Sequence, residues 1–203
     1  MSSERLRAVI FDLGGVIMDS PLDAIAAFEH RHGLPQGTVN GLVVSSGDDG
    51  AWARHERGEV DRESFLTLFA AEFAAIGADV DTAELMDAVD ASIRVRPEML
   101  RSVDRLRRQG TKTAALTNNW TPFGERGLVD HFDVVVESVM EGTRKPERRI
   151  YEICLERLGV DASECVMLDD LGPNLKPARA MGMTTVKVTS AAQARAALDA
   201  LFA

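Results

Sequence analysis

The sequence predicts an α/β protein in which helices cover both faces of a parallel sheet and a helical segment is inserted after the first strand. Two observations support this. Short apolar runs, mostly β-branched, alternate along the chain with amphipathic helical patterns, as in strand-helix-strand units. From about residue 18 to residue 96, however, there are several helical patterns and no convincing strand. A structureless loop of that length is rare in a compact domain, so this stretch is interpreted as helical.

Five apolar runs are the candidate strands, and each is too short to make a good helix. They cover residues 8–11, 113–116, 134–136, 166–168 and 185–188. The segments between them have helical spacing, clearest in "PERRIYEICLERLG", where Pro146 suits a first helical turn and Gly159 a C-terminal stop. We therefore predict a core domain of residues 1–17 plus 96–203 and a helical cap domain of residues 18–95.

Composition limits the classes of function. The chain has 203 residues with 45% hydrophobic, enough for one substantial core or for a core with a smaller appended domain. The net charge of -9 argues against binding to nucleic acid or an anionic membrane, so an anionic substrate must be met by local positive charge. Two cysteines give no disulfide framework, and no segment resembles a signal peptide or a membrane span. We expect a soluble, cytoplasmic protein, and the sequence leaves its oligomeric state open.

Polar residues follow the predicted strands at the carboxyl edge of the sheet, where ligands bind in open α/β folds. Asp12 ends the first run, Thr117 and Asn118 end the second, and the adjacent Asp169 and Asp170 end the fourth. Each has an ordinary structural explanation, as a turn or helix-capping residue. Two adjacent acids nevertheless crowd negative charge that a cation would relieve, and all the candidates meet at one edge.

Phosphoryl transfer is the chemistry that this set suggests. Mg²⁺ prefers oxygen ligands, commonly one or two carboxylates with water and phosphate oxygens. Asp12 would be the nucleophile and form an aspartyl-phosphate that water then hydrolyses. Thr117 and nearby backbone amides would donate to the phosphate, and Lys145, just before the helix that leads into the fourth strand, would balance its charge.

Four motifs, "FDLGGVI", "ALTNNW", "RKP" and "VMLDDLGPNLKPARAMGM", occur in this order and resemble those of the haloacid dehalogenase (HAD) superfamily. Within it, the likeness is strongest to the N-terminal phosphatase-type domain of mammalian soluble epoxide hydrolase and its bacterial relatives. The resemblance implies a Rossmann-like core with a helical cap and Mg²⁺-dependent phosphatase activity. It makes Asp12 the nucleophile and a metal ligand, Thr117 and Asn118 phosphate-binding residues, and Lys145 the positioning lysine.

The same resemblance makes the acidic pair metal ligands, with Asp170 the direct one and Asp169 close by or acting through water. The chain departs from the family pattern at Gly14, where these phosphatases usually carry an aspartate that protonates the leaving group and then activates water. The Gly14 backbone carbonyl would still serve the metal. A positioned acid or base, however, contributes about 10² to 10⁴ in rate.

Three explanations for the missing acid stay open. The substrate has a good leaving group, as in some sugar phosphates; another residue substitutes; or the protein is a catalytically weak binder of phosphorylated ligands. The candidate substitutes are Asp19, Asp48, Asp49, His55 and Glu56. We expect a phosphate-monoester hydrolase for a small phosphorylated metabolite, either a sugar phosphate or a lipid or isoprenoid phosphate. A dehalogenase-type hydrolase, in which Asp12 attacks a carbon bearing halogen without Mg²⁺, is the other enzymatic alternative.

Overall fold

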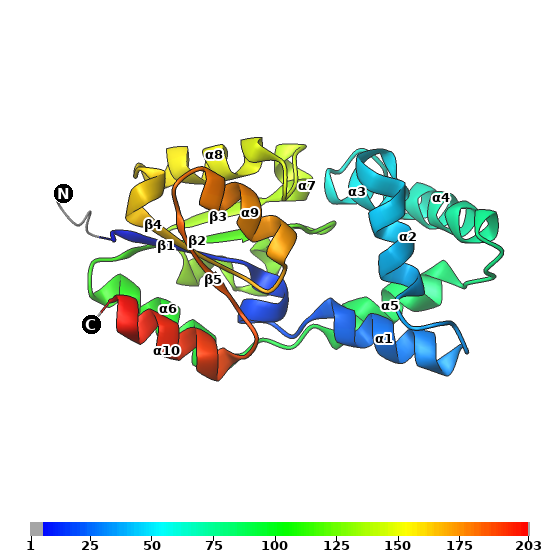
Figure 1. Ribbon diagram of the computed structural model, residues 1–203, viewed down its shortest axis with the longest axis horizontal. Coiled ribbons are helices and arrows are strands. Elements are labelled where there is room, and N and C mark those ends of the chain that lie inside the picture. Colours follow the sequence, from blue (N-terminus) through cyan, green and yellow to red (C-terminus); the bar gives the residue numbers. More distant parts are fainter. Residues whose placement is uncertain (1–5, 203) are drawn as a thin grey trace.

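The core is built on a five-stranded parallel sheet (Figure 1). The structure is a computed structural model and describes residues 6–202. The strand order is β3-β2-β1-β4-β5, with all neighbours parallel, so β1 lies in the middle of the sheet. The strands are β1 Ala8–Phe11, β2 Lys112–Thr117, β3 Val134–Glu137, β4 Cys165–Asp169 and β5 Thr184–Lys187.

Helices cover both faces of the sheet, as the sequence predicts. Successive side chains of a strand point to opposite faces, and β1 feeds two separate hydrophobic clusters for this reason. Val9 and Phe11 pack in the cluster that includes α6 and α10, whereas Ala8 and Ile10 pack in the cluster of α8 and α9. Figure 1 shows these helix pairs on opposite sides of the sheet. The core helices are α6 Pro97–Arg108, α7 Ser138–Glu141, α8 Arg148–Leu158, α9 Gly172–Ala180 and α10 Ala191–Leu201.

Each predicted strand is present with both ends within one residue of the apolar run, and one predicted helix start differs. Strand β5 begins and ends one residue earlier than the apolar run at 185–188. Helix α8 begins at Arg148, so placing Pro146 in its first turn was wrong. Residues 144–147 instead form a turn in which the Glu147 N–H donates to the Arg144 carbonyl at 2.7 Å, and the extended Glu147 caps the helix. Gly159 ends α8 with a φ of 62°, as expected of a C-terminal glycine.

The inserted segment is helical and has a hydrophobic cluster of its own, which we call the cap core. Its largest buried members are Phe28, Phe65, Phe69 and Phe73. Figure 1 shows these helices at one end of the molecule, beyond the carboxyl ends of the strands. The helices are α1 Pro21–Arg31, α2 Thr38–Ser46, α3 Ala51–Glu56, α4 Arg62–Ala75 and α5 Thr82–Ser92.

Two chain segments join the inserted helices to the core, and they lie side by side. Met18 and Val95 form an isolated antiparallel bridge. On either side of it, the Arg96 N–H donates to the Ile17 carbonyl at 2.8 Å and the Asp19 N–H donates to the Arg94 carbonyl at 3.0 Å. We propose that the core and cap domains divide within this pair of segments.

Two expectations from composition concern the whole chain. Both cysteines, Cys154 and Cys165, are free and buried, in line with the absence of a disulfide framework. Within residues 6–202, none of the helices has the length and apolar character needed to cross a membrane.

Candidate active site

Asp12 stands where β1 ends and the chain turns sharply. Its Oδ1 accepts a hydrogen bond from the Leu13 N–H at 2.7 Å and lies 2.8 Å from Lys145 Nζ. Both contacts use the same oxygen, and Oδ2 makes no hydrogen bond to the part of the chain that the structure describes. The turn depends on Gly15, whose φ of 71° lies in the left-handed region that favours glycine.

Lys145 is buried and bridges two carboxylates. Its ammonium lies 2.8 Å from Asp12 and 2.9 Å from Asp169. Burial alone would lower the pKa of Lys145, but the two carboxylates outweigh this and raise the pKa, so the side chain stays charged. The ammonium of Lys145 is thus a buried positive charge at the carboxyl edge of the sheet, shared by two carboxylates.

Three carboxylates, those of Asp12, Asp169 and Asp170, have oxygens within 4.8 Å of one another. Burial and the charge of Asp169 raise the pKa of both Asp12 and Asp170. This crowding of oxygen ligands is what a hard divalent cation relieves, so the donor set fits Mg²⁺.

The carboxylates of the two adjacent acids differ in how many hydrogen bonds they accept. Both oxygens of Asp169 are occupied, because they accept from the Leu171 N–H, the Asn174 amide and Lys145. Within residues 6–202, the Asp170 carboxylate accepts one side-chain hydrogen bond, from the Ser20 hydroxyl at 3.4 Å. Its carboxylate also lies against Gly15, where a Cβ would meet Asp170 Oδ2 at 2.1 Å. Gly15 therefore has to be glycine for this acid to approach the turn.

Thr117 and Asn118 lie at the end of β2, next to the same site. The Thr117 hydroxyl is buried and donates to the Asn118 carbonyl at 3.3 Å. The Asn118 side chain is fully engaged: its oxygen accepts from the Lys145 N–H at 2.8 Å, and its amide donates to the Lys145 carbonyl at 2.9 Å and to Glu56 at 3.3 Å. Asn118 thus holds the backbone of the bridging lysine, and its predicted contact with phosphate stays a prediction.

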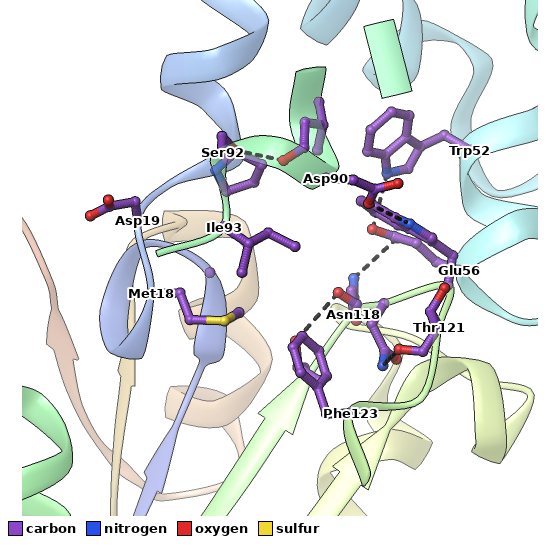
Figure 2. Close-up of a pocket in the computed structure, with 16 residues that line it drawn as sticks. Met18, Asp19, Trp52, Glu56, Asp90, Ser92, Ile93, Asn118, Thr121 and Phe123 are labelled. Carbon is purple, nitrogen blue, oxygen red and sulfur yellow. Dashed lines mark hydrogen bonds between the residues drawn. The ribbon is translucent and has the colours of Figure 1, made fainter. Parts of the chain in front are cut away.

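A cavity of about 120 Å³ lies between the inserted helices and the core beside these residues, and we call it the cap-core pocket (Figure 2). Core residues Gly14, Thr117 and Asn118 line one side, and Trp52 and Glu56 of α3 reach it from the cap. Most of the remaining lining is apolar or aromatic. The other lining residues are Met18, Asp19, Pro21, Val89, Asp90, Ser92, Ile93, Asn119, Trp120, Thr121 and Phe123.

This geometry agrees with comparisons to known proteins. A model of the haloacid dehalogenase-like hydrolase family matches residues 6–182. The chain belongs to this family. It is 30% identical to Phosphatase MT3486 of Mycobacterium tuberculosis, with 94% of this chain and 90% of that protein covered. The predicted HAD membership and fold are therefore confirmed, and the matched family is one of hydrolases.

Two longer relatives match over part of their length. The chain is 39% identical to Acyl-CoA dehydrogenase family member 10 of Mus musculus, with 96% of this chain and 19% of that protein covered. It is 31% identical to Bifunctional epoxide hydrolase 2 of Sus scrofa, with 90% and 36% covered, which bears out the predicted resemblance. The chain thus spans well under half of each.

Among solved structures, a HAD family enzyme from Bacteroides thetaiotaomicron, in complex with magnesium and inorganic phosphate, has a TM-score of 0.61 and 20% identity. The match covers 89% of this chain and 93% of the other. At this identity the likeness establishes the shared HAD fold alone.

Of the five candidate substitutes for the acid missing at Gly14, two line the cap-core pocket and three do not. Asp48 and Asp49 are exposed and do not line the pocket. His55 stacks on Phe65 inside the cap, and burial lowers its pKa. Only Asp19 and Glu56 line the pocket. Figure 2 shows the Asp19 carboxylate pointing away from Asn118 and Glu56.

Glu56 is the cap carboxylate that reaches the core of the HAD fold. It is buried, accepts from Trp52 at 3.0 Å and from Asn118, and pairs with Arg144 at 2.6 Å. From the sequence, Glu56 is a candidate only as a substitute acid, and neither Arg144 nor Asn174 is predicted as a site residue. Asn174 had a local signal, since it is five residues after Asp169 at the start of a helix, whereas Arg144 precedes Lys145 with no pattern linking it to the cap.

Proposed function

We propose that this HAD hydrolase is a Mg²⁺-dependent phosphate-monoester hydrolase that works through an aspartyl-phosphate on Asp12. The observation that carries the proposal is the state of the Asp12 carboxylate. Oδ1 is held by Leu13 and Lys145, and Oδ2 has no protein partner within the described residues. A nucleophile fixed through one oxygen and free at the other is oriented for in-line attack on phosphorus.

The chemistry divides among the residues of the site. Asp12 Oδ2 forms a bond to phosphorus as the ester P–O bond breaks, and the alcohol oxygen takes the electron pair and then a proton from solvent water. Lys145 opposes the rise in the pKa of Asp12 and holds its carboxylate in orientation, and the Thr117 hydroxyl with nearby backbone N–H groups donates to the phosphate oxygens. Water then attacks the acyl phosphate, which releases inorganic phosphate and restores Asp12.

The side chains of Asp12 and Asp170 and the backbone carbonyl of Gly14 would hold the metal. When bound, Mg²⁺ supplies charge neutralisation between the phosphate and the carboxylates. We assign Asp170 as the direct carboxylate ligand beside Asp12, because among the described residues its one side-chain partner is Ser20, at 3.4 Å. Asp169 is occupied by Lys145, Leu171 and Asn174, so we assign it to holding the lysine and to contact with the metal through water.

The lining of the cap-core pocket favours an apolar alcohol over a sugar. A sugar presents hydroxyl groups that need partners, whereas Met18, Ile93 and Phe123 offer apolar surface. The cavity is slightly smaller than the ~150 Å³ space that accommodates benzene in an engineered protein. We therefore assign the substrate to phosphates of apolar alcohols, the lipid or isoprenoid class, with a small ring or short chain beside the phosphate.

Restoring a carboxyl at residue 14 is expected to speed turnover. Gly14 has a φ of -61°, and a Cβ there would meet only Pro21, at 3.4 Å and beyond, so a side chain is accommodated. Gly14→Asp should raise kcat for butyl phosphate by up to about 100-fold and hardly change it for p-nitrophenyl phosphate, whose leaving group needs no proton. Steady-state kinetics on both esters measure the contrast.

Two outcomes bear on this expectation. Equal changes for both esters would contradict the missing-acid account. Gly15→Ala is the matched control, because its Cβ would occupy the position of the Asp170 carboxylate, so it should lose activity on both esters.

Metal dependence tests the proposed function against its alternatives. Hydrolysis of p-nitrophenyl phosphate should fall to background in excess EDTA and return on addition of Mg²⁺ beyond the chelator. Activity that survives EDTA would contradict the proposal. Halide release from 2-chloropropionate without Mg²⁺ would favour a dehalogenase, and metal-dependent binding of phosphate without turnover would favour a binding protein.

A further inference from the structure

The charged side chains that line the cap-core pocket all have the same sign. They are Asp19, Glu56 and Asp90, and among the described residues that line the pocket there is no lysine, arginine or histidine. Glu56 comes from α3 and Asp90 from α5, so carboxylates border the pocket from two cap helices. Figure 2 shows both beside Trp52 and Asn118, across the pocket from Met18.

Glu56 and Asp90 each accept a hydrogen bond from a tryptophan. Trp52 Nε1 donates to Glu56 at 3.0 Å, and Trp120 Nε1 donates to Asp90 at 3.3 Å. The two indoles meet edge to face, with centroids 5.6 Å apart and planes at 77°. Because both indole N–H groups are engaged by carboxylates, the rings contribute apolar surface to the pocket and no free N–H donor.

The arginines that pair with Glu56 and Asp90 do not line the pocket. Arg144 lies 2.6 Å from Glu56, and Arg62 lies 3.1 Å from Asp90. Each arginine pairs with its carboxylate but does not line the pocket, so neither offers a positive group to a ligand there. A second anion in the pocket would therefore lose its hydration next to two carboxylates and gain no counter-charge.

We propose that the cap-core pocket takes the alcohol part of the substrate and selects against a second negative charge. The ligands it accepts are phosphate monoesters of apolar alcohols that are neutral or carry an ammonium group, and phosphorylated acids and bisphosphates are rejected. This inference rests on the proposed function, because it places the phosphate at Asp12. Glu56 and Asp90 are then the specificity-determining residues.

Binding of three matched phosphonates tests the selection without requiring turnover. The probes are butylphosphonate, 3-aminopropylphosphonate and 3-phosphonopropanoate, each titrated with Mg²⁺ present. Trp52 and Trp120 are the two tryptophans of the chain, and both line the pocket, so quenching of intrinsic fluorescence reports occupancy. The carboxylate ligand should bind at least about tenfold more weakly than the other two. Equal affinities, or no binding of butylphosphonate, would overturn the inference.

Arg62 provides a matched pair of variants, because it contacts both Asp90 and Asp87. Only Asp90 lines the pocket, while the Asp87 side chain is 74% exposed. Asp90→Asn should reduce the discrimination against 3-phosphonopropanoate severalfold, and Asp87→Asn should leave it unchanged. An equal effect of both variants would mean that the arginine pairing, and not the pocket charge, sets the preference, which overturns the inference.

The two proposals fail in different ways. The proposed function is contradicted if butylphosphonate binds but butyl phosphate is not hydrolysed. The three affinities then still measure the selection. The charge selection is contradicted if hydrolysis requires Asp12 but the three ligands bind with equal affinity.

Discussion

Replacing Asp12 with asparagine is expected to reduce kcat for p-nitrophenyl phosphate by about 10⁴-fold or more while leaving the fold intact. The amide has no carboxylate oxygen with which to form an acyl phosphate, so the covalent route is lost. The fold should survive because the Asn side-chain oxygen can still accept from Leu13, and Lys145 keeps its 2.9 Å contact with Asp169. Kinetics beside thermal unfolding separate the two effects.

Asp199→Asn is the matched control for this variant. Asp199 lies on α10 and pairs with Arg105 at 2.6 Å, and its side chain is 63% exposed. Its replacement should leave kcat unchanged. If Asp12→Asn kept more than a tenth of the wild-type rate, Asp12 would not be the nucleophile.

Lys145→Met is expected to abolish activity and to destabilise the protein by about 3–5 kcal/mol. Methionine matches the length of the lysine stem but leaves the buried carboxylates of Asp12 and Asp169 without their shared cation. The activity loss follows because Asp12 is then neither oriented nor charge-balanced. Urea unfolding in the absence of Mg²⁺ measures the free energy without help from a metal.

Two further variants make this expectation specific. Lys176→Met, on the exposed side of α9, should change the unfolding free energy by less than about 0.5 kcal/mol. Adding Asp169→Asn to Lys145→Met should recover part of the lost stability, because one of the two uncompensated charges is removed. Additive losses in the double variant would contradict the account of Lys145 as a bridge between carboxylates.

Much of this site could be predicted from local sequence. The β-branched run before Asp12 and the run before Asp169 each fix a strand, and in a parallel sheet their carboxyl ends meet at one edge. Gly15 has the positive φ that the sharp turn after β1 requires. The parallel sheet, the helical insertion and the buried cysteines follow from the same short-range patterns.

Contacts between distant residues could not be predicted in this way. Glu56 meets Arg144 across 88 positions of sequence, and periodicity carries no information on such pairs. Asn118 was expected to bind phosphate because it follows a strand and matches a family motif. Its side chain also holds the backbone of Lys145, a contact that only the docking of two loops reveals.

The cap-core pocket was also beyond local reasoning. Trp120, which directly follows the "LTNN" segment, lines the pocket. Trp52 lines it too, and it also packs against the cap core. The pairing of each indole with a carboxylate depends on how the cap lies on the core, and no short sequence pattern specifies that arrangement.

Trapping the covalent intermediate tests the central claim most directly. A single turnover of p-nitrophenyl phosphate with excess enzyme is quenched and treated with borohydride, which reduces an aspartyl-phosphate to homoserine. Mass spectrometry of the peptide that contains residue 12 should find homoserine at that position in the wild-type protein. Release of p-nitrophenol with residue 12 unmodified, or with the modification at another carboxylate, would contradict the account.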